Sequence, residues 1–427
     1  MSHDQDGQRR IPESRLGRFA RLAAMGVRTG ASMLVERGGG SAAEHAAEVL
    51  GHLRGLAAKV GQMASYVDGL VPEQQAPAFE RALESLRAQA PRSSPEAIRA
   101  AVEQDLGAPI DARFVEWDDV PIASASIGQV HRARLHDGRE VAVKVQHPGI
   151  ARAVESDLAN ASLLESFVGA LGGKRFETRA MLDVMRTRFR EELDYAHEAE
   201  SLRAFGRVHA GDPTVRIPAL AEECCGARVL TTEMARGASF EQACGATEAE
   251  RRAWAQTMWR FVFKGTLVGG LLNADPHPGN YVFQEDGRVT FLDFGCIQSF
   301  AERRPFAVRI HRAALARDEA EFARGVKLMV ASKPGPLEDL AIAYTRRCFD
   351  PLFGSPYRIT KSYAASMVEG MREMALVGRK LPMDQFFSMP PEMLFVNRLQ
   401  FGFYSVLARL DMDCDYASVE RGFISQA

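Results

Sequence analysis

A chain of 427 residues is long enough for two or three domains, or for one enzyme built of two lobes. Apolar residues make up 46% of it and charged residues 25%, as in ordinary soluble globular proteins. The formal net charge of −2 provides no broad field to attract nucleic acid or anionic lipid, so we expect no nucleic-acid partner.

Cysteine spacing and hydropathy indicate the compartment. The six cysteines form no C-x-x-C pair and no zinc-binding spacing, which fits a reducing cytoplasm. The N-terminal residues are polar, so no secretory signal is visible. No apolar run reaches the roughly 18 residues that a membrane span needs. We therefore expect a cytoplasmic protein.

Residues 1–110 show helical patterns and no strand pattern, which predicts a helical N-terminal extension. Ser14–Leu34 has the pattern of a basic amphipathic helix. We expect it to pack on the protein itself, and docking to a membrane surface or a partner is the alternative. Lys59 and Gln62 share a helix face because they lie three residues apart. On the residues alone, Lys59 is interpreted as a surface lysine.

Strand patterns begin after residue 110 and flank a loop of small residues. In kinases the loop G-x-G-x-x-G-x-V lets backbone N–H groups approach phosphate oxygens. Alanine still allows this approach but resists the positive φ of glycine, so we infer a stiffer loop. Its candidate nucleotide-binding positions are Ala123, Ser124, Ala125, Ser126, Gly128 and Val130.

The next strand ends in a candidate phosphate-binding lysine. Asp137-Gly138 predicts a hairpin turn, and Val-Ala-Val-Lys144 follows it. The lysine of this motif in kinases pairs with the α- and β-phosphates. We assign that role to Lys144, and a strand-end lysine in solvent is the alternative.

Acidic residues then cluster in a long helical pattern over residues 177–205. Asp194 and Glu198 are four residues apart, so we expect them on one helix face. Carboxylates near a nucleotide could orient Lys144 and contribute to a metal site, whereas a solvated acidic face is the simpler interpretation. The cluster comprises Glu191, Glu192, Asp194 and Glu198.

Two further strands and a hinge are predicted before the C-terminal half. Val215–Leu220 and Arg228–Glu233 have strand patterns, and the small polar residues after Met234 suit a hinge. We assign Glu233 and Ala235, beside this hinge, to the nucleotide site. A helix near Glu248–Gly269 and a mainly helical remainder to about Tyr416 flank the most informative stretch of the chain.

That stretch runs from Asp275 to Gly295. Two short apolar runs joined by a Glu-Asp-Gly turn predict a hairpin that links Asp275-x-x-x-x-Asn280 to Asp293-Phe-Gly. Phosphoryl transfer needs this set, one Asp for the attacking oxygen and an Asn and an Asp for Mg²⁺. We therefore assign Asp275 to catalysis and Asn280 and Asp293 to the metal. A proline-rich turn beside an ordinary hairpin is the alternative.

These motifs together resemble the UbiB/AarF atypical kinase family, the coenzyme-Q kinase-like ATPases. The resemblance runs from Lys59 to about Ser299. It takes in Lys59-Val-Gly-Gln62 as the K-x-G-Q motif, the alanine-rich loop, Val-Ala-Val-Lys144, Glu192-Leu-Asp194 with Glu198, and the stretch from Asp275 to Gly295.

The resemblance implies roles that the residues alone do not give. Lys59 and Gln62 would gate the site from the N-terminal extension, and Glu192 and Asp194 would hold that extension and the metal side. Glu198 would position Lys144. ATP and Mg²⁺ would be the cofactors, an isoprenoid or quinone-type lipid a partner, and the protein would contact a membrane peripherally.

The chain departs from the family pattern in three places. Asn273 stands two residues before Asp275, where a histidine is more usual, and Glu198-Ala-Glu-Ser201 replaces E-A-x-N. The C-terminal part matches least and lacks the hydrophobic tail hairpin of some bacterial members. No Ala-Pro-Glu follows Gly295 within a plausible activation segment, so we expect no peptide-binding platform of the ordinary protein-kinase type.

We therefore predict an α+β, bilobal, protein-kinase-like fold. The helical extension would occupy residues 1–110, a lobe with an inserted helix 111–235, and a mainly helical lobe 236–427. The predicted function is Mg²⁺-dependent ATP hydrolysis or phosphoryl transfer in isoprenoid-lipid or quinone metabolism. A small-molecule phosphotransferase and a catalytically silent nucleotide-binding scaffold are the alternatives.

Overall fold

The computed structural model describes residues 93–124, 127–159, 190–378, 380–381 and 392–427. Lys59, Gln62 and the helix predicted over 14–34 lie outside these residues. The chain divides into two compact units. The first unit comprises Met1–Ala101, Asp119–Val130 and Val145–Leu193, and the second comprises Val102–Asp118, His131–Lys144 and Asp194–Ala427.

The strand patterns after residue 110 form a sheet with the order β1-β3-β4-β6. The short strand β2 pairs antiparallel with the start of β3, Ala123 opposite Val130 and Ser124 opposite Gln129. Gly138 has φ +90°, which the predicted turn between β3 and β4 requires. The strands are β1 (Phe114–Trp117), β2 (Ala123–Ser124), β3 (Gly128–Leu135), β4 (Glu140–Gln146) and β6 (Val229–Glu233).

Helices α5, α6, α7 and α10 are the described helices of this part of the chain. The segment after the His147-Pro148 pair continues as helix α7. In the first unit, Ser93 connects the segment before α5 to later chain, because its hydroxyl lies 2.9 Å from His147 Nδ1. The helices are α5 (Pro95–Leu106), α6 (Ile110–Arg113), α7 (Ile150–Ala159) and α10 (Tyr195–Val208).

The strand predicted over Val215–Leu220 is wrong in length. Only β5 (Val215–Arg216) forms, and it pairs in parallel with β9 in a different sheet from β6. Pro218 explains the early end, since proline has no N–H to continue a ladder. Leu220 then makes an isolated bridge to Thr232 of β6. The short 3₁₀ helix η1 (Glu222–Cys224) follows it.

The predicted hairpin between Asp275 and Gly295 is confirmed. Its strands pair antiparallel with Tyr281 opposite Phe291, and its turn uses Asp286 and Gly287 at positive φ. A second antiparallel pair brackets the hairpin, with Asn273 opposite Ile297. The elements are β7 (Leu271–Asn273), η2 (Pro278–Asn280), β8 (Tyr281–Phe283), η3 (Glu285–Gly287), β9 (Val289–Phe291) and β10 (Ile297–Ser299).

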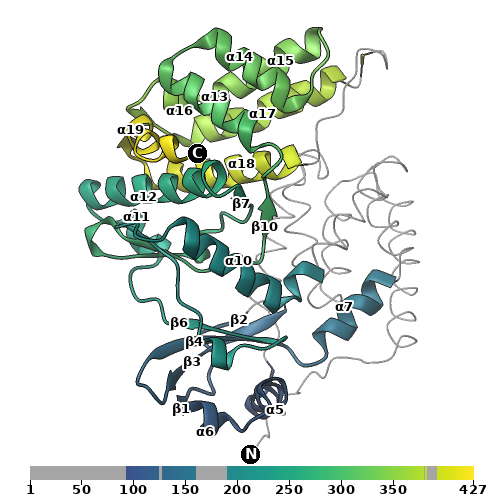
Figure 1. The fold of residues 1–427 in the computed structure, drawn as a ribbon, viewed down its shortest axis with the longest axis vertical. Helices are drawn as coiled ribbons and strands as arrows, with labels where there is room; N and C mark the ends of the chain where they lie inside the picture. Colours follow the sequence, from purple (N-terminus) through teal and green to yellow (C-terminus); the bar gives the residue numbers. More distant parts are fainter. Residues whose placement is uncertain (1–92, 125–126, 160–189, 379, 382–391) are drawn as a thin grey trace, which may run out of the picture. The chain divides into compact units, whose positions relative to one another are not determined.

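The long helix α12 (Glu248–Leu267) is the centre of the second unit's core (Figure 1). A capping box between Thr247 and Glu250 begins it. Its apolar residues surround the whole helix, which is typical of a helix buried on all sides. Trp259 is 1% exposed and stacks on Tyr404, so α12 joins the hairpin region to the C-terminal helices.

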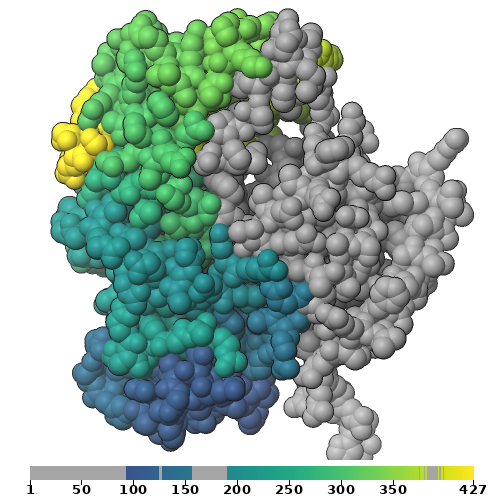
Figure 2. All heavy atoms as spheres, turned by 45° about the vertical axis from the view of Figure 1, so that its right-hand side comes forward, coloured from purple at the N-terminus to yellow at the C-terminus, as the bar shows by residue number. Residues whose placement is uncertain are grey.

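The C-terminal remainder is mainly helical, as predicted. Helices α13 to α17 (green) form one continuous packed surface, with the C-terminal segment (yellow) beside them (Figure 2). No described helix has the length and apolar character needed to cross a bilayer. The elements are α11 (Phe240–Cys244), α13 (Arg304–Ala316), α14 (Glu319–Val330), α15 (Pro336–Cys348), α16 (Asp350–Phe353), β11 (Tyr357–Arg358), α17 (Lys361–Gly378), α18 (Glu392–Leu410), β12 (Asp413–Cys414), α19 (Tyr416–Arg421) and η4 (Ile424–Gln426).

Candidate active site

A partly buried ion pair joins β4 to α10 in the second unit. Lys144 Nζ lies 2.8 and 2.7 Å from the two carboxylate oxygens of Glu198, which is only 3% exposed. Burial works to lower the pKa of Lys144, but the carboxylates of Glu198 and Asp293 outweigh it and raise the pKa above its ordinary value. Lys144 therefore remains a fixed cation, as a phosphate-binding group requires.

The helix that carries Glu198 begins later than the sequence predicts. The helical pattern is broken at Leu193, and Asp194 is the N-cap of α10, its carboxylate accepting from His197 N at 3.0 Å. Aspartate favours this position because its side chain satisfies an otherwise unpaired N–H. The expectation that Asp194 and Glu198 share a helix face is thus wrong. Glu192 precedes the break, and residues 190–192 are helical.

Asp293 is held beside this ion pair by its own tight turn. Gly295 N donates to Asp293 Oδ1 at 2.9 Å. A Cβ on Gly295 would lie 3.3 Å from that oxygen and 3.6 Å from Glu198 Oε2, so both carboxylates border this glycine. Phe294 is fully buried and packs on Phe205 of α10, with ring centroids 5.3 Å apart. One helix therefore fixes both Glu198 and the turn that presents Asp293.

The loop from Asp275 to Asn280 is closed by the asparagine amide. Asn280 Nδ2 donates to the backbone oxygen of Asp275 at 3.2 Å and lies 3.4 Å from Asp275 Oδ2. Asp275 is 8% exposed. Since the nitrogen of the Asn280 amide is engaged, its oxygen is the atom suited to a hard cation such as Mg²⁺.

Asn273 connects the loop that begins at Asp275 to the turn that carries Asp293. The sequence analysis did not assign this function to it. Its Nδ2 donates to the backbone oxygen of Asp293 at 3.0 Å, and its Oδ1 accepts from Asp275 N at 3.1 Å. One amide thus fixes Asp275 and Asp293 relative to each other. The feature of the sequence that singled out Asn273 was that a histidine is more usual at this position in the family.

The hinge assigned to residues after Met234 connects the sheet to the hairpin within the second unit. Met234 N donates to Glu140 O at 3.0 Å, and Ala238 pairs with Phe283 of β8. Gly237 has φ +153°, and a Cβ there would lie 2.3 Å from Phe283 O, so this close crossing needs glycine. Glu233 and Ala235 lie in this crossing, and their assignment to the nucleotide remains a prediction.

Other predicted positions belong to the first unit or lie outside the described residues. Ala123, Ser124, Gly128 and Val130 form the β2–β3 hairpin of the first unit. Ala125 and Ser126, like Lys59 and Gln62, lie outside the described residues. Within the described part, no three His, Cys, Asp or Glu side chains form a metal-binding group.

The α+β fold, the Lys–Glu pair and the Asp–Asn and Asp-Phe-Gly loops define the protein-kinase-like class. The ABC1 atypical kinase-like domain matches residues 85–325, more than half of the chain. The chain therefore belongs to the ABC1 (UbiB) family of atypical kinases.

Relatives agree with this membership. The mitochondrial atypical kinase COQ8B of Rattus norvegicus is 28% identical over 95% of this chain and 80% of its own length. The mitochondrial atypical kinase coq-8 of Caenorhabditis elegans is 27% identical over 86% of this chain and 49% of its own. The chloroplastic ACTIVITY OF BC1 COMPLEX KINASE 7 of Arabidopsis thaliana is 32% identical over 58% of this chain and 36% of its own.

The structural comparison confirms the fold. The complex of Rv3197 with erythromycin from Mycobacterium tuberculosis superimposes with a TM-score of 0.60 at 23% identity. The superposition covers 94% of this chain and 97% of that one. At this identity the likeness establishes the shared fold.

Proposed function

We propose that this protein binds Mg·ATP and hydrolyses it, or transfers its terminal phosphoryl group to a small or lipid-like acceptor. The observation that carries the proposal is the cluster in the second unit, where Lys144, Glu198 and Asp293 lie together and Asn273 holds Asp275 to the same turn. A protonated lysine, two hard oxygen ligands and a buried carboxylate form the set that phosphoryl transfer uses.

The proposed roles follow from the chemistry of each side chain. Lys144 neutralises charge on the α- and β-phosphates, and Glu198 keeps its ammonium in place. Asn280 and Asp293 would hold Mg²⁺, which neutralises charge on the phosphates when bound. Asp275 accepts a hydrogen bond from the attacking water or hydroxyl and orients it.

The cellular role is proposed from family membership. The named mitochondrial relatives are atypical kinases, and the family resemblance indicates isoprenoid-lipid or quinone metabolism. We propose a lipid of that class as partner and peripheral contact with a membrane. Lipid that copurifies with the chain, identified by mass spectrometry, tests this part separately from the nucleotide chemistry.

The test of activity is phosphate release from ATP by the full chain. We expect Mg²⁺-dependent release that Asp275→Asn lowers by at least about a hundredfold, because the attacking oxygen loses its acceptor. Arg324→Gln, on the exposed side of α14, is the control and should match the wild type. Binding of Mg·ATP with no turnover would replace this proposal with the silent scaffold, and rapid phosphorylation of a soluble alcohol such as choline would favour the small-molecule phosphotransferase.

A further inference from the structure

The ammonium of Lys144 has an aromatic neighbour to which the proposed roles assign nothing. Lys144 Nζ lies over the ring of Tyr195, 5.0 Å from its centroid. A cation within about 6 Å of an aromatic centroid is attracted by the negative charge of the ring face, and more strongly where the groups are shielded from water. The Tyr195 side chain is fully buried. Its ring is therefore a second group, besides Glu198, that attracts this ammonium.

One turn of α10 carries both groups. Tyr195 is the first residue of the helix and Glu198 lies three residues later, so the ring and the carboxylate share a helix face. The Asp194 cap fixes this turn by accepting from His197 N at 3.0 Å. The carboxylate oxygens of Glu198 bond to the ammonium at 2.8 and 2.7 Å, and the ring face lies beside the same ammonium. The first turn of α10 thus binds the lysine through two different side chains.

A second carboxylate competes for the lysine. Asp293 Oδ1 and Glu198 Oε2 border the same glycine, because a Cβ on Gly295 would lie 3.3 Å from the first and 3.6 Å from the second. A lysine has a flexible four-carbon stem, so its ammonium could pair with either carboxylate. Pairing with Asp293 would occupy oxygens that we assign to Mg²⁺. Glu198, unlike Asp293, shares its helical turn with the ring, so the ring favours pairing with Glu198.

We propose that Tyr195 is a positioning residue whose ring holds the Lys144 ammonium on Glu198 and so leaves Asp293 open to the metal. The consequence for the metal rests on the proposed function, whereas the effect on the lysine does not. A ring that only fills the core would do so equally well with any charge on its face. The charge on the ring face is therefore the quantity to vary.

The test changes that charge and keeps the shape of the ring. Tyr195 is replaced by phenylalanine and by phenylalanines with one, two and three ring fluorines, which withdraw electrons from the face in steps. The full chain is labelled with ¹³C-lysine and kept free of nucleotide. NMR relaxation of the Lys144 ε-methylene, identified by its loss in Lys144→Arg, then measures how firmly the ammonium is held. We expect its mobility to rise with each added fluorine.

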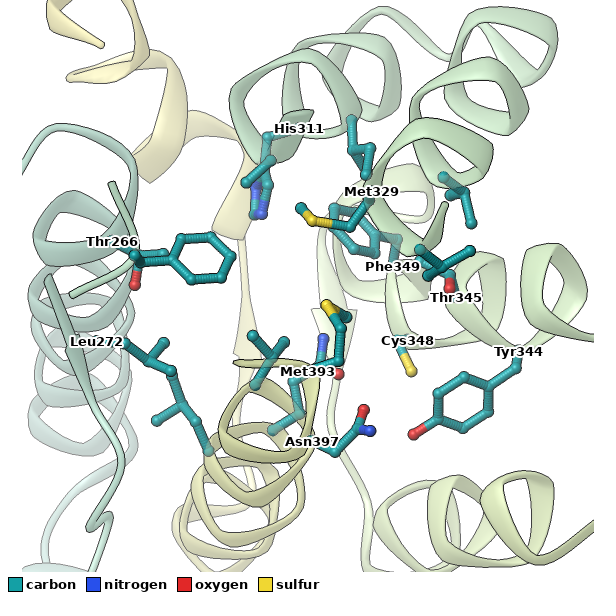
Figure 3. A pocket seen from close by; sticks show the side chains of 18 of the residues that line it. Thr266, Leu272, His311, Met329, Tyr344, Thr345, Cys348, Phe349, Met393 and Asn397 are labelled. Atoms are coloured by element: carbon teal, nitrogen blue, oxygen red, sulfur yellow. The ribbon is translucent and has the colours of Figure 1, made fainter. Parts of the chain in front are cut away.

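Calorimetric titration of Mg·ATP into the same proteins measures the consequence for the nucleotide site. We expect Tyr195→Phe to bind within about threefold of the wild type, and the trifluorinated ring to bind about tenfold more weakly than Tyr195→Phe. The same fluorinated residues at Phe349 are the control. This ring lies among the C-terminal helices, where it packs against His311 and Phe322 (Figure 3). They should change neither the mobility of Lys144 nor the affinity for Mg·ATP.

The two measurements separate this proposal from the proposed function. Equal mobility of Lys144 at every degree of fluorination would overturn the proposal, because the ring would then act by its shape alone. A graded mobility with constant Mg·ATP affinity would also overturn it, since the position of the lysine would not matter to the metal. A graded mobility in a protein that binds no Mg·ATP would support the hold on Lys144 and contradict the proposed function instead.

Discussion

At the scale of single residues, the account depends most on Asn273. Its amide donates to Asp293 O and accepts from Asp275 N, so it sets the separation of the proposed attacking and metal sites. We predict that Asn273→Ala lowers phosphate release by about tenfold or more, since small misplacements of catalytic groups are costly. Affinity for Mg·ATP should fall less than turnover does.

A comparison with Asn273→Asp separates the two hydrogen bonds. Aspartate keeps an acceptor for Asp275 N but has no donor for Asp293 O. Turnover of Asn273→Asp should lie between the wild type and Asn273→Ala at pH 7. Equal turnover in all three proteins would show that the amide only fills space.

The residues of the ion pair were predictable, and the amide clamp was not. Lys144, Glu198 and Asp293 belong to motifs in which the residue types themselves indicate the chemistry. Asn273 lies outside those motifs, and its two partners include a backbone oxygen that any sequence would provide. Such a contact depends on the register of β7 against β10, which the sequence alone does not specify.

At the scale of elements, α18 supports the catalytic loop through a glycine. A Cβ on Gly402 would lie 2.4 Å from Pro276 Cγ, and the proline ring cannot rotate away. We predict that Gly402→Ala displaces the loop and lowers turnover by about fivefold or more, although alanine is the better helix former by about 1 kcal/mol.

Gly206→Ala is the matched control for this substitution. Gly206 lies within α10, and a Cβ there meets no atom within 4 Å. It should leave turnover unchanged and raise the free energy of unfolding by up to about 1 kcal/mol. If both variants keep wild-type turnover, α18 does not position the loop.

The end of α10 contains a buried histidine that should make stability depend on pH. His209 stacks on Phe261, with ring centroids 5.3 Å apart, and its ring nitrogens have no hydrogen-bond partner among the described residues. Burial lowers the pKa of His209 from 6.5 to about 4, and the charge of Lys264 adds to the effect, while Asp212 opposes it. The folded protein therefore keeps this ring neutral.

The sign of the pH dependence follows from this difference. Between pH 6.5 and pH 4 the unfolded chain binds a proton that the folded chain does not, so stability is fully present above pH 6.5 and falls as the solution is acidified. The loss attributable to His209 should reach about 3 kcal/mol. Urea unfolding at pH 7 and pH 4.5 measures it. His209→Phe should remove this part of the loss, and the exposed His136→Phe should not.

The element patterns were predictable where the apolar period was long and unbroken, as in α12 and β4. They failed where a single residue ended an element. Pro218 shortened the strand at Val215, and Asp194 stopped one helix by capping the next. Both residue types are known breakers, but whether a proline or aspartate ends an element depends on contacts elsewhere in the fold.

At the scale of the whole molecule, family membership and the second unit's cluster support the same conclusion from different evidence. The ABC1 domain match rests on sequence, whereas the Lys144–Glu198 pair and the Asn273 clamp rest on geometry.

The central claim is that the cluster is a Mg·ATP site, and calorimetric titration of Mg·ATP tests it most directly. We compare the wild type with Asp293→Asn, which removes the proposed anionic metal ligand, and with Asp339→Asn, which removes the same charge from the exposed start of α15. We predict wild-type affinity in Asp339→Asn and an affinity about tenfold or more weaker in Asp293→Asn, with both variants folded. Equal Mg·ATP affinity in all three proteins would contradict the assignment of this cluster as the nucleotide and metal site.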